Sequence, residues 1–447
     1  MSNKTLALAA ICFGFFMMTI DIFIVNVALP IIGHEMHASL SDLQWIVDGY
    51  ALTFAGLLLS AGALGDRFGG KKIFIASLIL FTIASLGCAV ATQLWVLLSC
   101  RFLQGIGAAG LVPTSLALLN AIYPDQGERA RAIGIWAAIA SVAAAIAPAL
   151  GAFLTAFFSW RSVFFVNLPI GIIAIFAAWK FIQQPTPRHK NPIDIAGQVF
   201  GIVTIAALVY GLIEAGRMGW SNKLVLLSLA IFVMSGIVFI VVEYRQRLPM
   251  LPLKLFRSPI FCTSLLSALI LNFGYYGFVF VMPLYFHEVR DYSILLTGLA
   301  ILPISGITFL SAYYGGRFTA KFGSRKPLLA GHSIMLISFI ALFIAVHFDA
   351  AYWILMWPLF GIGIGAPQIM TAMTSAAMHT APHEQAGLVS AVLNTNRQLG
   401  GLIGVAIFGT IITTASSFVH GMGISICLAV IAYLIGIVIT LVWMKQT

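Results

Sequence analysis

Two charged residues stand within stretches of sequence that are otherwise apolar. Asp21 lies in the run from about Leu8 to Pro30, and Arg101 lies in the run from 97 to 120. A carboxylate deep in a membrane costs about 2.5–3.5 kcal/mol on insertion scales, so it must face a cavity, pair with a cation or bind a proton. Such a site offers reversible proton binding, because burial disfavours the charged carboxylate whereas water or a nearby cation favours it.

The depths of these two residues would allow them to meet. Asp21 stands about nine residues, or roughly 13 Å, before the end of its run, and Arg101 about five residues, or roughly 8 Å, after the start of its own. The long arginine side chain can cover the difference. The alternatives are a structural hydrogen bond for Asp21 and an arginine that extends to the headgroups. Gln104, three residues after Arg101, would share its helix face.

Asp48 is a third acidic candidate, near the start of the apolar run from 46 to 64. Trp45 and Tyr50 flank it, and both residue types are typical of the membrane interface. A hydrated carboxylate is therefore one interpretation. The other is that Asp48 attracts cations or passes protons toward Asp21, and we include it among the proton-coupling residues.

A polar cluster interrupts the apolar run from 388 to 415. It contains Asn394, Arg397 and Gln398, and such a cluster is costly unless it faces a cavity or is satisfied internally. Because the later helices carry no buried acid, Arg397 must find carbonyls, amides, water or an anionic group of a substrate. We predict a substrate cavity lined by Asn26, Gln104, Asn394, Arg397 and Gln398.

Composition excludes several classes of protein. Of the 447 residues, 61% are hydrophobic and 9% are charged, against roughly 45–50% apolar and 25% charged in soluble domains. The net charge of +10 comes from a few scattered basic residues, a poor phosphate-binding surface, so nucleic acid is not the expected partner. The five cysteines show no CxxC spacing, so neither a disulfide framework nor a metal site is indicated. The absence of a Walker loop argues against direct use of ATP.

Fourteen apolar runs are long enough to cross a membrane as helices. The first is too long for the apolar core of a signal peptide, so we expect it to be retained. The runs lie near 8–30, 46–64, 73–94, 97–120, 131–156, 161–182, 195–213, 223–244, 260–286, 294–317, 326–347, 350–378, 388–415 and 420–444.

The distribution of basic residues predicts the orientation of the chain. One set of loops and ends holds 18 of the 24 Lys and Arg residues, the opposite set holds 4, and Arg101 and Arg397 lie within helices. The positive-inside rule therefore predicts that both termini of this multi-pass protein face the cytoplasm. We expect the protein to lie in the cytoplasmic (inner) membrane. The set of 18 is Lys4, Arg67, Lys71, Lys72, Arg129, Arg131, Lys180, Arg188, Lys190, Arg245, Arg247, Lys254, Arg257, Arg317, Lys321, Arg325, Lys326 and Lys445.

The sequence contains an internal repeat. The segment from Gly62 to Lys71 lines up with 316–325 at an offset of 254, and Gly105-Ile-Gly107 lines up with Gly361-Ile-Gly363 at an offset of 256. We therefore predict an all-α integral membrane protein with two six-helix bundles, 1–182 and 258–447, and two inserted helices in 183–257. Parallel repeats of this kind place a substrate site near the bilayer midplane and work by alternating access.

Five motifs resemble those of a known family. The loop Gly62-x-Leu-Gly-Asp66-Arg67-x-Gly69-x-Lys71 resembles the signature loop of the major facilitator superfamily, and Arg101-Phe-Leu-Gln104-Gly105-Ile-Gly107 resembles its helix-four motif. Three further stretches are similar to its fourteen-helix drug:proton antiporter branch: Asp21-Ile-Phe-Ile-Val-Asn26-Val-Ala-Leu-Pro30, Trp160-Arg161 through Asn167-Leu-Pro169-Ile-Gly171, and Asp194-Ile-Ala-Gly197 with Tyr210, Glu214, Gly216, Gly219 and Trp220.

The resemblance implies roles for several residues. Arg101 would interact with the proton-carrying acid. The gating residues would be Asp66, Arg67, Gly69 and Lys71 of the signature loop and Pro148 of the antiporter pattern, although a solvated charge cluster is the alternative for the loop. The antiporter pattern appears here as Ala147-Pro148-Ala-Leu-Gly151-Ala152, without two of its glycines, and Ala320 replaces Asp66 in the second half.

Together these features predict a proton-coupled antiporter that exports amphiphilic, cationic or neutral small molecules. We expect no enzymatic activity, and no cofactor beyond the proton gradient as energy source. The expected partners are the small-molecule substrate, protons and membrane lipid, and we expect a monomer. One alternative is a dedicated exporter of a metabolite such as a siderophore, amino acid or osmolyte. The other is a membrane sensor that does not transport.

Overall fold

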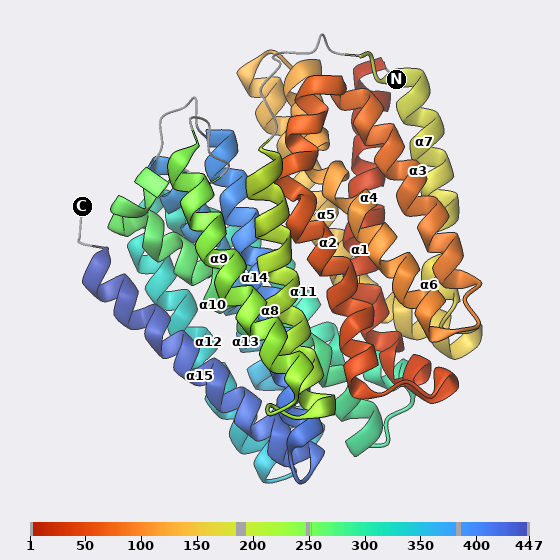
Figure 1. The fold of residues 1–447 in the computed structure, drawn as a ribbon, viewed down its shortest axis with the longest axis vertical. Helices are drawn as coiled ribbons and strands as arrows, with labels where there is room; N and C mark the ends of the chain where they lie inside the picture. The colour runs from red at the N-terminus through yellow and green to blue at the C-terminus, as the bar shows by residue number, and fades with distance from the viewer. Residues whose placement is uncertain (1–2, 185–193, 247–250, 252, 381–385, 445–447) are drawn as a thin grey trace. The chain divides into compact units, whose positions relative to one another are not determined.

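The computed structural model describes residues 3–184, 194–246, 251, 253–380 and 386–444. Every regular element among them is helical, and fourteen helices are long and apolar enough to cross a membrane (Figure 1). The predicted number of spans is therefore confirmed.

Several helices extend beyond the predicted apolar runs, whereas α3 ends at Ala89, before the end of the run from 73 to 94. The N-terminal ones are α1 (Asn3–Met36), α2 (Leu40–Phe68), α3 (Gly70–Ala89), α4 (Leu94–Ile122), α5 (Gln126–Phe157), and α6 (Ser162–Phe165) with α7 (Asn167–Phe181), which form one span. They are followed by α8 (Ile195–Met218), α9 (Lys223–Arg245), the 3₁₀ helix η1 (Leu253–Arg257), α10 (Pro259–Leu284), the π-helical η2 (Tyr285–Val289), α11 (Ile294–Phe322), α12 (Arg325–His347), α13 (Tyr352–His379), α14 (Ala386–Thr414) and α15 (Phe418–Trp443).

The structure at the start of α2 explains why the predicted beginning of this helix, at residue 46, was wrong. The Ser39 hydroxyl accepts a hydrogen bond from the backbone N–H of Asp42 (3.3 Å), and the Asp42 carboxylate accepts one from the backbone N–H of Ser39 (2.9 Å). This capping box satisfies two donors that a helix start leaves open. The helix therefore begins at Leu40 instead of residue 46, and Asp48 lies two turns inside it.

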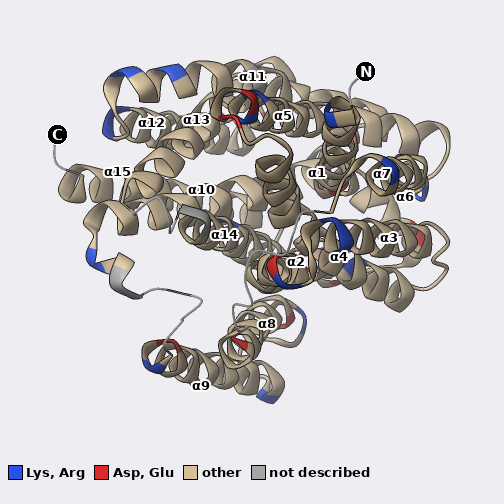
Figure 2. Ribbon diagram, turned by 90° about the horizontal axis from the view of Figure 1, so that it is seen from above, with Lys and Arg blue, Asp and Glu red and all other residues tan. Residues whose placement is uncertain are grey.

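The chain divides into two compact units. The first comprises residues 1–198 and 294–298, and the second comprises 199–293 and 299–447. Nearly all of α8 and all of α9 thus belong with the C-terminal helices. Within the second unit α8 and α9 lie side by side (Figures 1 and 2), and the Thr204 hydroxyl donates to that of Ser235 across 3.0 Å.

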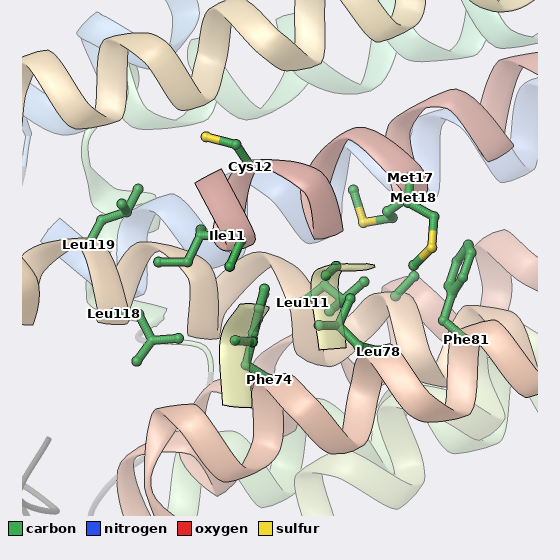
Figure 3. Close-up of a cluster of buried hydrophobic side chains, with 14 of the residues drawn as sticks. Ile11, Cys12, Met17, Met18, Phe74, Leu78, Phe81, Leu111, Leu118 and Leu119 are labelled. Atoms are coloured by element: carbon green, nitrogen blue, oxygen red, sulfur yellow. The ribbon is translucent and has the colours of Figure 1, made fainter. Parts of the chain in front are cut away.

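The first unit has an apolar core between α1, α3 and α4. Figure 3 shows Met17 and Met18 of α1 close to Leu78 and Phe81 of α3, with Leu111 of α4 beside them. All five side chains are buried. Because lipid tails are as apolar as these side chains, close packing rather than exclusion of water holds such helices together.

Glycines at helix crossings establish the register of the internal repeat. A Cβ atom on Gly107 would lie 3.0 Å from the carbonyl oxygen of Ser77, and one on Gly365 would lie 3.0 Å from that of Gly331. Ser77 and Gly331 are 254 residues apart, the offset of the two signature loops. Gly107 therefore corresponds to Gly365, 258 residues further on, and the predicted match to Gly363 was wrong by two residues.

Charged residues are few along the helices, and most of the ribbon in Figure 2 belongs to neither charged class. This agrees with the 9% charged composition. Of the basic residues used to predict the orientation, Arg188, Lys190, Arg247 and Lys445 lie outside the described residues.

Candidate functional site

Asp21 and Arg101 form an ion pair inside the first unit. Nη1 of Arg101 lies 2.6 Å from Oδ2 of Asp21, and the two side chains are 2% and 0% exposed. The bond joins the middle of α1 to the first part of α4, as the estimated depths of the two residues suggested. Breaking such a buried pair by removing one partner usually costs about 3–5 kcal/mol, because it leaves the other charge uncompensated.

Gln104 extends the pair into a network. Its Oε1 accepts from Nη1 of Arg101 (2.8 Å), while its Nε2 donates to Oδ1 of Asp21 (3.2 Å) and to the hydroxyl of Ser85 on α3 (2.8 Å). Gln104 and Ser85 are fully buried. We expected Gln104 in a substrate cavity, but the structure encloses it between the charged pair and α3.

Asn167, the first residue of α7, completes the shell around the carboxylate. Its Nδ2 donates to Oδ1 of Asp21 over 2.8 Å. The carboxylate of Asp21 thus receives hydrogen bonds from Arg101, Gln104 and Asn167, which lie on α4 and α7.

Arg101 also contacts α2. Its Nε donates to the carbonyl oxygen of Ile46 (2.9 Å), and its guanidinium carbon lies 4.5 Å from the centroid of the Tyr50 ring. The Phe164 ring lies on the guanidinium as well, at 5.8 Å. One planar cation therefore connects α1, α2 and α4, which a lysine could not do with the same geometry.

Asp48 lies outside this network. Its side chain is 0% exposed, and within the described residues neither carboxylate oxygen has a hydrogen-bond partner. Full burial contradicts the interpretation that Asp48 is hydrated at the interface. Asp48 therefore has no hydrogen-bonded connection to Asp21 in this structure.

The signature loop forms a tight turn between α2 and α3. Gly69 has φ +98°, a left-handed conformation that L side chains rarely adopt, and a Cβ there would collide with the amide of Gln184. Lys71 donates to the carbonyl oxygen of Trp179 on α7 (2.7 Å). Asp66 and Arg67 are exposed at the end of α2. In the second half, Gly323 occupies the same place with φ +72°.

The antiporter pattern lies where α5 crosses α1. Pro148 is buried, and a Cβ on Gly151 would lie 2.8 Å from the carbonyl oxygen of Ile24. A Cβ on Gly298, at the start of α11, would lie 2.8 Å from the carbonyl oxygen of Pro148. Small residues therefore permit close backbone contact on two sides of this segment, despite the two missing glycines.

Arg397 lies in the second unit on α14 and is partly buried. Nη1 binds Oδ1 of Asn394 (3.2 Å), and Nη2 contacts the sulfur of Met370 on α13 (3.6 Å). In the described part of the chain Arg397 forms no ion pair, and its Nε has no hydrogen-bond partner. The guanidinium thus has only neutral partners there. Gln398 beside it is partly buried.

Asn26 differs from these residues because its amide donates within its own helix. Nδ2 binds the carbonyl oxygen of Ile22 (2.9 Å), and the side chain is buried. The bond leaves its Oδ1 as the atom available to other groups. The structure therefore brings Asp21, Arg101 and Gln104 together in the first unit, where Asn26 hydrogen-bonds its own helix instead. Asn394, Arg397 and Gln398 belong to the second unit.

Ser85 and Asn167 are site residues that we did not predict. Asn167 belongs to one of the five motifs, so its polar side chain just after an apolar turn was an available signal. Ser85 carried no comparable signal, because a serine within an apolar helix commonly bonds its own backbone. It does so here too, donating to the carbonyl of Phe81 (2.8 Å).

Comparison with known proteins decides the family. The sequence model of the Major Facilitator Superfamily matches residues 11–405. The chain belongs to this superfamily. It is a multi-pass membrane transporter and not an enzyme, as the signature loop and the repeat predicted.

Individual facilitator relatives are resistance and efflux proteins. A methylenomycin A resistance protein of Bacillus subtilis (strain 168) is 33% identical over 437 residues, which cover 98% of this chain and 93% of the relative. The multidrug resistance protein Stp of Mycobacterium tuberculosis (strain CDC 1551 / Oshkosh) is 34% identical over 412 residues, covering 92% of this chain and 76% of the relative. The predicted membership of the fourteen-helix drug efflux branch is thereby confirmed.

Solved facilitator structures share the fold. A bacterial homolog of the human lysosomal transporter Spinster, in an inward-facing and occupied conformation, has a TM-score of 0.72 at 17% identity over 100% of this chain and 98% of that one. A POT family transporter in complex with 5-aminolevulinic acid has a TM-score of 0.74 at 15% identity, covering 98% of this chain and 96% of the other. At these identities the likeness establishes the fold alone.

Proposed function

We propose that this facilitator is a proton-coupled antiporter, which exports amphiphilic cationic or neutral small molecules across the cytoplasmic membrane by alternating access. It acts as a monomer with both termini in the cytoplasm. The observation that carries the proposal is the buried pair of Asp21 and Arg101, enclosed by Gln104 and Asn167. The names of the two resistance relatives support the substrate class.

The network supplies a proton-dependent bond between helices. As a carboxylate, Asp21 binds the guanidinium of Arg101 and accepts two further hydrogen bonds. A proton on Asp21 removes its negative charge and weakens its attraction for Arg101, which keeps the Ile46 carbonyl and Gln104 as partners. Protonation therefore loosens α1 from α4 and biases the conformational equilibrium.

The proton gradient is sufficient to drive export. One proton that descends 100 mV releases about 2.3 kcal/mol. A tenfold concentration ratio requires about 1.4 kcal/mol. One or two protons per substrate can therefore sustain gradients of about fortyfold to about two-thousandfold.

We assign the gating of the conformational change to the signature loop and to the crossing of α5 with α1 at Pro148. Asp66 and Arg67 present opposite charges at the exposed end of α2, and Lys71 ties α3 to α7. Because Ala320 replaces the acid in the second half, only the first half of the protein has this acidic gating residue. It sets the balance between conformations rather than substrate affinity.

Transport in proteoliposomes tests the proposal. The substrate is the compound against which expression of the protein gives the largest gain in resistance, chosen from dyes, quaternary amines and metabolites. An imposed pH gradient, without ATP, should drive its accumulation, and addition of the substrate should drive protons the opposite way. Substrate movement without any movement of protons would contradict antiport.

One observation favours a second candidate, a dedicated exporter of a metabolite with an anionic group. Arg397 is a partly buried cation with neutral partners in the described part of the second unit. A carboxylate on the substrate would bind this guanidinium, whereas a cationic drug would be repelled. A siderophore or an amino acid carries such a group, and the same growth screen separates this candidate from drug export.

A further inference from the structure

Asp48 is an acid that the coupling network does not use. It lies on α2, is 0% exposed, and has no hydrogen-bond partner for either carboxylate oxygen among the described residues. Moving an isolated carboxylate out of water costs tens of kcal/mol by Born solvation, so a group in this position becomes neutral instead. Burial without a partner therefore favours the neutral acid form over the carboxylate.

The position of Asp48 around its helix separates it from Asp21. Ile46, Gly49 and Tyr50 face α4, through the Arg101 guanidinium and the Phe102 ring. At 100° per residue, Asp48 points roughly opposite to this face. The carboxyl group of Asp48 is thus turned away from the guanidinium that binds Asp21.

The helices of the first unit that contact α2 offer Asp48 no counter-ion. Arg101, the cation on α4, binds Asp21, and the Glu35 carboxylate binds Trp160 and Arg161. None of the titratable groups on these helices bonds to Asp48 in the described part of the chain; they are Lys4, Cys12, Asp21, His34 and Glu35 on α1, Lys71, Lys72 and Cys88 on α3, and Cys100 and Arg101 on α4.

We propose that Asp48 is a second proton-binding site, separate from Asp21, and that the transporter moves two protons in each cycle. In the conformation described here Asp48 holds a proton. When the face of α2 that bears it becomes hydrated, the proton leaves to water and the carboxylate remains. The inference rests on the proposed function and adds its stoichiometry.

Two polar residues lie on α2 between its start and Asp48. Ser41 and Gln44 lie seven and four residues before Asp48, on the same side of the helix, and both are buried. Their hydroxyl and amide groups can bind water molecules that pass a proton to Asp48. In the proposed orientation, the start of α2 faces the outside of the membrane, from which protons enter.

The two proton sites are linked mechanically through α2. Arg101 binds Asp21 with Nη1 and the carbonyl oxygen of Ile46 with Nε. Ile46 precedes Asp48 by two residues on the same helix. A proton on Asp21 that loosens Arg101 therefore also frees the segment of α2 that carries Asp48.

Infrared spectroscopy of the purified protein tests the protonated state without any substrate. At neutral pH, the wild-type protein should show the C=O stretching band of a neutral carboxylic acid that is lost in Asp48→Asn. Asp42→Asn removes another carboxylate from α2, in the exposed capping box, and should leave the band unchanged. An Asp48→Asn spectrum identical to the wild-type spectrum would overturn the proposal.

Stoichiometry gives a second readout that separates this inference from the proposed function. The substrate gradient that balances a known proton gradient should correspond to two protons per substrate in the wild type and to one in Asp48→Asn. Loss of all proton movement in Asp21→Asn together with unchanged stoichiometry in Asp48→Asn would refute the second site and leave the antiporter intact. If Asp48→Asn does not fold, Asp48→Glu should keep both the band and the stoichiometry, and a loss of either would overturn the assignment.

Discussion

Arg101 and Asp21 form a buried ion pair, 2.6 Å between Nη1 and Oδ2, that joins α4 to α1 within the first unit of the protein. The same guanidinium reaches α2 at Ile46 through Nε. A proton that arrives at Asp21 therefore changes the contacts of three helices at once. This relationship is the basis of the predictions that follow.

Arg101→Ala should destabilise the protein by about 3–5 kcal/mol, because it leaves the Asp21 carboxylate buried without its partner. Arg101→Lys should keep the charge but lose the fork that binds Asp21 and Ile46 together, and should lower export at least tenfold. Thermal unfolding in detergent and transport assays measure the two effects. Lys4→Ala, which removes an exposed ion pair with Glu128, should cost no more than about 1 kcal/mol; an equal loss in both Ala variants would contradict the account.

Asn167→Ala and Ser85→Ala should both weaken proton coupling. Asn167 donates directly to Asp21, and a hydrogen bond to a charged group contributes about 1.5–3 kcal/mol. We expect a loss of tenfold or more in proton-driven export for Asn167→Ala and a smaller loss for Ser85→Ala, which acts through Gln104. Ser99→Ala removes a hydroxyl that bonds only its own helix at Trp95 in the described structure, and its transport should match the wild type.

Gly69→Ala should slow transport while leaving substrate affinity nearly unchanged. The left-handed backbone costs an alanine about 1–2 kcal/mol, and its Cβ would displace Gln184. Gly134→Ala is the matched control, since a Cβ there has no neighbour within 4 Å. The maximum rate and the half-saturating concentration for each variant distinguish a gating effect from a binding effect, and a change in affinity alone would argue against the gate.

Arg397→Gln should change which compounds are exported while keeping proton coupling. Loss of the guanidinium should weaken export of substrates with a carboxylate by tenfold or more and should spare or improve export of cations. A resistance profile of the variant over anionic, neutral and cationic compounds measures this. Arg317→Gln, which removes an arginine stacked on Tyr313 in α11, should leave the profile unchanged; a uniform loss across all compounds in Arg397→Gln would indicate a structural role.

The sequence was sufficient to predict the number of helices, because each span is a long apolar run that must satisfy its own backbone in lipid. It also predicted the meeting of Asp21 and Arg101, since helix rise converts residue counts into depths. The capping box at Ser39 and Asp42 was visible in the sequence as well, and recognising it would have placed Asp48 inside α2 instead of at the interface.

Other features depend on how the helices rotate and cross, which no local pattern specifies. Gln104 was expected to line a cavity, yet the packing of α3 against α4 turns it toward Ser85 and Asp21. The register of the repeat was ambiguous because three glycines alternate with isoleucine from Gly361 to Gly365. Only the crossing contacts of Gly107 and Gly365 resolved it.

Substrate-driven proton movement in Asp21→Asn tests the central claim most directly. Glu35→Gln is the control, because it removes a second carboxylate from α1 whose side chain is 46% exposed. In proteoliposomes that contain a pH-sensitive dye, the substrate should drive protons through the wild type and Glu35→Gln but not through folded Asp21→Asn. Proton movement in Asp21→Asn at the wild-type rate would contradict the account.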